Sequence, residues 1–171
     1  MTDASVSTEG GRTCVRLERH FVDPPAIVWR ALTERDQLRT WFPCDVVVDG
    51  GRWVVGARIT FIFPPEVIDI TLSGEVIDLE EPSRLAYRWG DEVLRFELSE
   101  DHGGTLLVLF DELPPSFAAR NAAGWDDCLD RLVGKTAPAS AWREHFNQYQ
   151  RDFEPILGPQ EGPPAEYKGS L

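Results

Sequence analysis

The 171-residue sequence predicts one α+β domain in which a curved antiparallel sheet of seven strands wraps around a long C-terminal helix, with an apolar cavity between them. Segments that alternate apolar and polar residues are separated by short turns rich in Gly, Pro and Asp, which is typical of antiparallel strands. Near the end of the chain the apolar period changes to three and four residues, which predicts a helix. A chain of this length buries enough apolar surface for a single core.

The two ends of the chain are predicted to be flexible tails. Residues 1–12 and 158–171 are rich in Gly, Pro, Ser and charged residues and contain few large apolar side chains. Such segments gain too little from burial to offset the entropy that they lose on ordering. The intervening residues 13–157 are expected to form the one domain.

A strand and two short helices are expected at the start of this domain. Residues 13–22 place Val15, Leu17 and Phe21 on one face, and this period of two is typical of a half-buried strand. A helix is predicted from Pro24, because proline suits the first helical turn. A second short helix is predicted after Thr33, which resembles a capping residue.

Six further strands are predicted between these helices and the long helix. The connections between them are too short for helical crossovers, so neighbouring strands should be antiparallel. The predicted strands are residues 44–48, 52–63, 67–79, 84–89, 93–99 and 105–111.

Two helices are predicted after the sheet. The principal helix extends from Ser116 to Val133, and Gly134 marks its end. A second helical stretch follows Ser140 and is expected to pack outside the sheet or along the principal helix. Its aromatic stripe would form a homodimer surface if it did not pack within the chain. The stripe consists of Trp142, Phe146, Tyr149 and Phe153.

The charge and hydropathy of the chain limit its partners and its location. A formal net charge of −12 repels nucleic-acid phosphates and anionic lipids, and we find no clustered basic face. We therefore expect neither nucleic acid nor a membrane as a partner. The sequence starts without the pattern of a signal peptide and has no apolar run of about 18 residues, so it predicts a cytoplasmic protein.

The usual sequence signatures of catalysis and metal binding are missing. The sequence has no GxSxG, HExxH or GxGxxG motif and no phosphate-binding loop. Its three histidines fall in separate elements, too dispersed for one metal site. Cys14, Cys44 and Cys128 form no CxxC pair and are interpreted as small buried hydrophobes. We predict no catalytic residue, metal or cofactor, and the question of enzymatic activity stays open.

A candidate binding site is predicted where the sheet faces the principal helix. Aromatic side chains from both elements would surround one cavity, and aromatic rings are the usual lining of an apolar ligand site. The alternative is that these rings simply fill the core. The candidate ligand-binding residues are Arg19, Trp41, Trp53, Phe61, Tyr87, Trp89, Phe96, Trp125 and Leu129.

Polar groups in this region would orient a ligand. Arg19 has the inward parity of its strand, so it either meets a carboxylate inside or lies at the strand end with its head in solvent. Tyr87 also has inward parity and would offer a hydroxyl to the cavity. If Arg19 and Tyr87 both face inward, an amphipathic ligand is favoured. Asp126, Asp127 and Asp130 on the principal helix are expected mostly to face water.

Five segments occur in an order that matches a known family: DPPAIVWRALTERDQLRTWF, GGRWVVGARITFIF, SGEVIDLEEPSRLAYRW, GGTLLVLF and AAGWDDCLDRL. They cover about residues 13–135 and resemble the activator of Hsp90 ATPase homologue family. This family belongs to the START/Bet v 1-like SRPBCC superfamily, so the resemblance implies the helix-grip fold. Relatives in the superfamily include lipid carriers, polyketide cyclases and plant hormone receptors.

Three functions are compatible with these observations. The first is binding of an apolar or amphipathic small molecule between the sheet and the principal helix. The second, implied by the resemblance, is a co-chaperone role in which an acidic surface contacts an Hsp90-type ATPase; the eukaryotic activators have an additional N-terminal domain that the resemblance does not cover. The third is a cyclase or hydrolase that uses the same cavity, although no matched acid and base are visible in the sequence.

Overall fold

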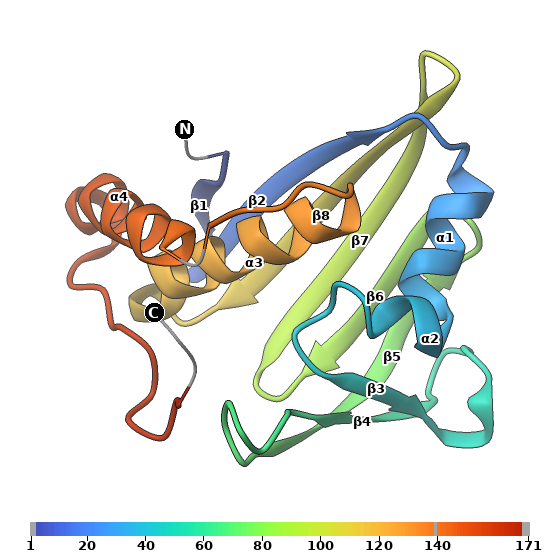
Figure 1. Cartoon of the computed structure of the whole chain (residues 1–171), viewed down its shortest axis with the longest axis horizontal. Helices are drawn as coiled ribbons and strands as arrows, with labels where there is room; N and C mark the ends of the chain where they lie inside the picture. The colour runs from blue at the N-terminus through green and yellow to red at the C-terminus, as the bar shows by residue number, and fades with distance from the viewer. Residues whose placement is uncertain (1–2, 139, 169–171) are drawn as a thin grey trace.

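One continuous curved antiparallel sheet forms the body of the molecule (Figure 1). The computed structural model describes residues 3–138 and 140–168, and within them eight strands lie in the order β1-β2-β8-β7-β6-β5-β4-β3. The strands are β1 (Ser5–Glu9), β2 (Arg12–Phe21), β3 (Asp45–Val48), β4 (Arg58–Ile62), β5 (Thr71–Glu80), β6 (Arg84–Trp89), β7 (Glu92–Asp101) and β8 (Gly104–Leu113). The predicted α+β class and the antiparallel sheet are therefore confirmed.

The sheet has eight strands rather than the predicted seven. The additional strand, β1, lies in the segment 1–12 that was predicted to be a flexible tail, and it pairs with β2 so that Ser5 is opposite Arg16. Most of its side chains are exposed on both faces. An edge strand without a buried face needs no apolar alternation, so its sequence lacks the signal on which the strand prediction depends.

The predicted strand 52–63 is also shorter in the structure. Strand β4 begins only at Arg58, and the preceding residues form a loop in which Gly56 has a φ of 88°. Trp53 lies in this loop, and its indole Nε1 donates a hydrogen bond to the carbonyl oxygen of Thr33 at 2.8 Å. The remaining predicted strands are present within a few residues of their expected bounds.

Two short helices, α1 (Pro25–Thr33) and α2 (Arg35–Leu38), follow β2 as predicted. Their buried side chains are Val28, Trp29, Leu32 and Leu38. Trp41 and Phe42 come directly after α2 and are also buried. These helices therefore close one end of the space beneath the sheet (Figure 1).

Helix α3 (Ala118–Leu132) packs on the sheet, and α4 (Ala141–Leu157) packs along α3 (Figure 1). The aromatic stripe of α4 belongs to the core: Tyr149 and Phe153 are buried, and the rings of Trp142 and Phe146 stack on each other. The stripe is therefore used within the chain, which removes the surface on which the homodimer hypothesis depended. Helix α3 is covered on two faces, by the sheet and by α4.

The chain after α4 lies against the domain, although residues 158–171 were predicted to be a flexible tail. The Gln160 side chain accepts a hydrogen bond from the Ala119 backbone N–H at 2.9 Å. The backbone N–H of Glu161 donates to the Ser116 carbonyl, and that of Lys168 donates to the Val67 carbonyl. This segment thus connects the start of α3 with the loop between β4 and β5.

Candidate functional site

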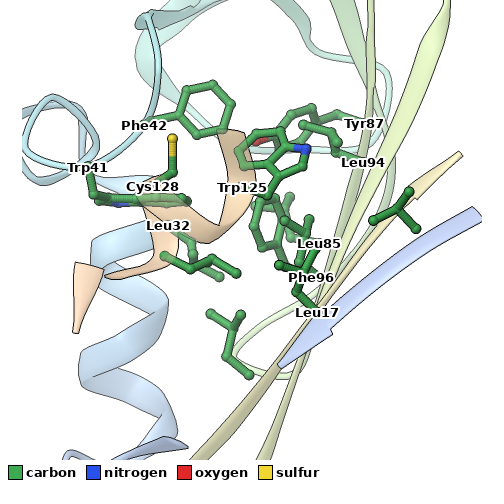
Figure 2. Packing of buried hydrophobic residues seen from close by; sticks show 14 of the residues in the cluster. Leu17, Leu32, Trp41, Phe42, Leu85, Tyr87, Leu94, Phe96, Trp125 and Cys128 are labelled. Atoms are coloured by element: carbon green, nitrogen blue, oxygen red, sulfur yellow. The ribbon is translucent and has the colours of Figure 1, made fainter. Parts of the chain in front are cut away.

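The predicted aromatic residues come together between the sheet and α3. Trp53 and Trp89 are half-buried, whereas the other predicted aromatic side chains are at most 2% exposed. Figure 2 shows Trp125 extending from α3 toward Tyr87 and Leu94 of the sheet, with Phe42 on its other side. The fully buried members of the predicted set are Trp41, Phe61, Tyr87, Phe96, Trp125 and Leu129.

The rings in this layer contact one another directly. Trp125 lies 5.3 Å from Trp89 and 5.6 Å from Phe42, measured between ring centroids. Tyr87 lies 5.6 Å from Phe61 and 6.1 Å from Phe96. These are ordinary aromatic packing distances, so in this conformation the rings fill the predicted cavity.

Two open hollows lie elsewhere. One, of about 490 Å³, is bordered by the loop around Trp53 and by β3. The other, of about 380 Å³, lies beside Arg19 and includes Val133 and Lys135. Apart from Trp53, the aromatic layer lines neither hollow, so a ligand between α3 and the sheet would have to displace side chains or separate the two.

A pair of carboxyl groups lies at the edge of the aromatic layer. Asp111 of β8 is fully buried, and Glu92 at the start of β7 is half-buried. The Asn121 amide of α3 donates to Glu92 Oε2 at 2.9 Å and to Asp111 Oδ2 at 3.0 Å, and Trp125 Nε1 donates to the same Asp111 oxygen at 2.9 Å. We call these four residues the Glu92 cluster.

The two carboxyl groups of the Glu92 cluster share a proton near neutral pH. Burial, followed by the neighbouring Asp111, raises the pKa of Glu92 to about 9. Burial also raises the pKa of Asp111 to about 6, although hydrogen bonds from Trp125 and Asn121 oppose this effect. Glu92 and Asp111 are hydrogen-bonded to each other, and this bond requires a proton on one of them. Glu92 is therefore the protonated partner at pH 7.

Two polar atoms near this pair lack a conventional partner. Asp111 Oδ1 is buried and receives no N–H hydrogen bond from the described residues. The buried Trp89 Nε1 also meets no oxygen acceptor among them and has the Cys44 thiol as its polar neighbour. Unsatisfied buried groups are uncommon in folded proteins and call for an explanation such as a bound molecule.

Arg19 points inward and belongs to a different cluster. Its guanidinium lies 2.8 Å from Asp126 Oδ1 and 3.2 Å from Asp130 Oδ1, and the Tyr149 hydroxyl of α4 donates to Asp126 Oδ2. We call these four residues the Arg19 cluster. Burial raises the pKa of Asp126, although Tyr149 and Arg19 both lower it. The prediction that these aspartates face water is wrong for Asp126, because α4 covers that face of α3.

The Glu92 cluster was not predicted, although part of its signal is in the sequence. Asp111 has the same parity in β8 as Leu107, Leu109 and Leu113, and all three of these leucines are buried. A charged residue on an otherwise apolar strand face indicates a buried carboxyl. The position of Glu92 at the turn between β6 and β7 gave no comparable signal.

A model of the family described as activator of Hsp90 ATPase homolog 1-like protein matches residues 23–135. The chain belongs to this family. The finding agrees with the five segments that the sequence shares with it and with the helix-grip arrangement of α3 against the sheet. No match was found among curated proteins.

Solved structures share this family's fold. A conserved protein of unknown function from Enterococcus faecalis, EF2215, is 27% identical with a TM-score of 0.73, covering 90% of this chain and 91% of its own. CalU16 from Micromonospora echinospora is 20% identical with a TM-score of 0.69, covering 92% and 98%. DynU16, a protein of the dynemicin biosynthetic locus, is 25% identical with a TM-score of 0.61, covering 71% of this chain and 46% of its own.

The described part of the chain contains neither a membrane-spanning helix nor a group of side chains that could hold a metal ion. None of its helices combines the length and apolarity that crossing a bilayer requires. In the same part of the chain, no three His, Cys, Asp or Glu side chains are grouped so that they could hold a metal ion.

Proposed function

We propose that this protein binds an apolar or amphipathic small molecule between the sheet and α3. The observation that carries the proposal is the Glu92 cluster, which places one buried and one half-buried carboxyl group at the edge of a layer of aromatic rings. Apolar surfaces with a few convergent polar groups are typical of small-molecule sites. The similarity to DynU16, from a biosynthetic locus, gives further support.

Binding would require local movement, because the rings fill the space between the sheet and α3. Trp89 is the natural element to move, since it is only half-buried and its indole N–H makes no bond to oxygen. Rotating it would break one aromatic stack with Phe63 and contacts with Phe42 and Trp125. A ligand with an aromatic or apolar body would replace those contacts.

Native mass spectrometry of gently purified protein, compared with the same sample denatured, tests this function. We expect an additional mass that leaves on denaturation. Asp111→Asn should reduce the occupancy of this adduct, whereas Glu100→Gln, an exposed carboxyl on the same strand as Glu92, should retain it. A bare chain in every preparation would contradict the proposal.

An acid–base enzyme is the second candidate, and the same pair of carboxyl groups favours it. At pH 7 Glu92 holds a proton while Asp111 is largely ionised, so the pair presents one acid and one base in contact. If the mass of a bound compound is found, that compound should be converted by the wild-type protein. Glu92→Gln and Asp111→Asn should each stop the conversion while still folding.

An Hsp90-type partner is supported only by the family description and by the net charge of −12. Adding the purified protein to an Hsp90-type ATPase tests it. An increased rate of ATP hydrolysis would support the co-chaperone function, and an unchanged rate at saturating protein would exclude this mode of action.

A further inference from the structure

The Glu92 cluster contains two carboxyl groups and no cation. In the described part of the chain, no lysine or arginine side chain forms an ion pair with Glu92 or Asp111. The guanidinium of Arg120 is the nearby positive charge, but it stacks 3.7 Å above the Phe117 ring and donates to the Gly162 carbonyl. Buried carboxylates are normally compensated by a cation or by a proton, and the negative charge left on Asp111 has no ion-pair partner among the described residues.

The surroundings of the pair also suit a cation. Trp125 contacts Asp111 through its indole N–H, and the rings of Trp89 and Phe42 lie next to Trp125. The faces of such rings attract organic cations, most strongly when water is excluded. Carboxylates together with indole rings are therefore a recognition surface for an ammonium group attached to an apolar body.

We propose that the Glu92–Asp111 pair, with Trp89 and Trp125 beside it, recognises the positively charged head of an amphipathic amine. This inference rests on the proposed binding function and assigns the charge class of the ligand. The apolar body lies in the aromatic layer, and the ammonium group donates to Asp111 Oδ1, the oxygen that receives no N–H bond within the described residues.

Binding of the amine is coupled to release of a proton. The ammonium group favours the ionised form of both carboxyl groups, so Glu92 gives up the proton that it shares with Asp111, and affinity increases with pH up to about 9. Other charged groups around the pair are Arg120 on α3, which favours ionisation of Glu92, and Glu112 on β8, which opposes ionisation of Asp111. On β2, Cys14 is opposite Glu112 and next to Asp111, and burial raises its pKa to about 11, so it stays neutral.

Three naphthalene compounds of similar size test the charge class by isothermal titration calorimetry on the full chain. They are the cation 1-naphthylmethylamine, the neutral 1-naphthalenemethanol and the anion 1-naphthoate. At pH 7.5 we expect the amine to bind at least about tenfold more tightly than the alcohol and the naphthoate not to bind. Titrations in phosphate and in Tris should differ in enthalpy, because the amine releases a proton that the buffer takes up.

Variants test whether the preference for the amine depends on the Glu92–Asp111 pair. Glu92→Gln keeps the shape of the protonated carboxyl, so it should fold, and it should remove both the proton release and the preference for the amine. Asp111→Asn should do the same if its thermal unfolding stays cooperative, and Glu100→Gln should behave like the wild type.

Each outcome separates the two proposals. Equal affinity for the amine and the alcohol would overturn the cation inference and leave the binding function intact. A preference for the amine that survives in Glu92→Gln would place the cation elsewhere and also overturn it. If no probe binds and native mass spectrometry shows a bare chain, the binding function itself fails.

Discussion

The Arg19 cluster and the Glu92 cluster both bury aspartates against α3, on two different faces of the helix. In the Arg19 cluster the buried Asp126 has a guanidinium 2.8 Å away and the Tyr149 hydroxyl on its other oxygen. In the Glu92 cluster, Asp111 has only neutral donors and a second carboxyl. The first cluster compensates its charge within the chain, whereas the second reduces its charge by holding a proton.

This difference indicates that the Arg19 cluster stabilises the fold, whereas the Glu92 cluster is a candidate binding site. The Arg19 cluster connects β2, α3 and α4, and also the backbone N–H groups of Asp3 and Ala4, which donate to the Tyr149 hydroxyl. All its charges have partners, so a ligand would gain little there. The Glu92 cluster holds a proton on Glu92 and leaves Asp111 Oδ1 without an N–H donor, in apolar surroundings. A charged ligand group would therefore change the ionisation of this cluster.

Replacing the cation of the Arg19 cluster should have the largest effect on stability. Arg19→Met removes the guanidinium that pairs with buried Asp126 and leaves only His145 Nδ1, 4.0 Å away, as a basic neighbour; removing one partner of a buried pair costs about 3–5 kcal/mol. Urea unfolding followed by tryptophan fluorescence measures the loss. The matched control is Arg30→Met, because Arg30 forms an exposed pair with Glu34 and its removal should leave the midpoint unchanged. Equal urea midpoints for the two variants would show that the Arg19 cluster does not stabilise the fold.

Removing the indole N–H from the Glu92 cluster should have an intermediate effect. Trp125→Phe leaves Asp111 with one side-chain N–H donor instead of two, and losing a hydrogen bond to a buried carboxylate costs about 1–3 kcal/mol. Trp142→Phe is the control, because the Trp142 indole stacks on Phe146 and meets no carboxylate among the described residues. A smaller loss for Trp125→Phe than for the control would contradict the importance of this bond.

Sequence patterns predicted the fold well where one face of an element is apolar and the other is polar. Val15 and Leu17 mark β2 in this way, and both are fully buried. The predictions failed at elements with other surroundings. Strand β1 exposes nearly all its side chains, so it has no periodic pattern to detect, and α3 is buried on two faces, so Asp126 was wrongly placed toward water.

The candidate site was predicted only in its apolar part. Burial brings Trp125, Tyr87 and Phe61 together because large rings avoid water wherever they occur in the sequence. The pairing of Glu92 with Asp111 depends instead on the register of β7 and β8, in which Val93 is opposite Glu112 and Leu94 is opposite Asp111. Register cannot be read from either strand alone, so the pair becomes visible only in the folded structure.

Removing one hydroxyl from the Arg19 cluster should have a smaller effect than either change above. Tyr149→Phe keeps the ring in the core and leaves Asp126 paired with Arg19, so the loss should be about 1 kcal/mol. Hydrogen exchange should reveal faster exchange of the Asp3 and Ala4 backbone amides, which lose their acceptor. Unchanged exchange at these two amides would indicate that the hydroxyl does not hold the start of the chain.

Glu92→Gln should have its smallest effect near pH 5, because glutamine resembles the protonated carboxyl of the folded protein and the unfolded chain has only begun to ionise there. The effect should grow with pH. Folding raises the Glu92 pKa from its ordinary value of 4.5 to about 9, so its contribution to stability is fully present below pH 4.5 and is lost as the pH rises through about 9. The variant has no carboxyl to ionise and should therefore be more stable than the wild type at pH 9.

Urea midpoints at pH 5, 7 and 9 test whether the stability of Glu92→Gln relative to the wild type rises with pH. Glu100→Gln, which changes an exposed carboxyl, is the control. The difference between Glu92→Gln and the wild type should increase from pH 5 to pH 9, and the control should show no such trend. If both variants follow the wild-type pH profile in parallel, Glu92 is ionised in the folded protein at neutral pH. The Glu92 cluster would then lack the proton that distinguishes it from the Arg19 cluster.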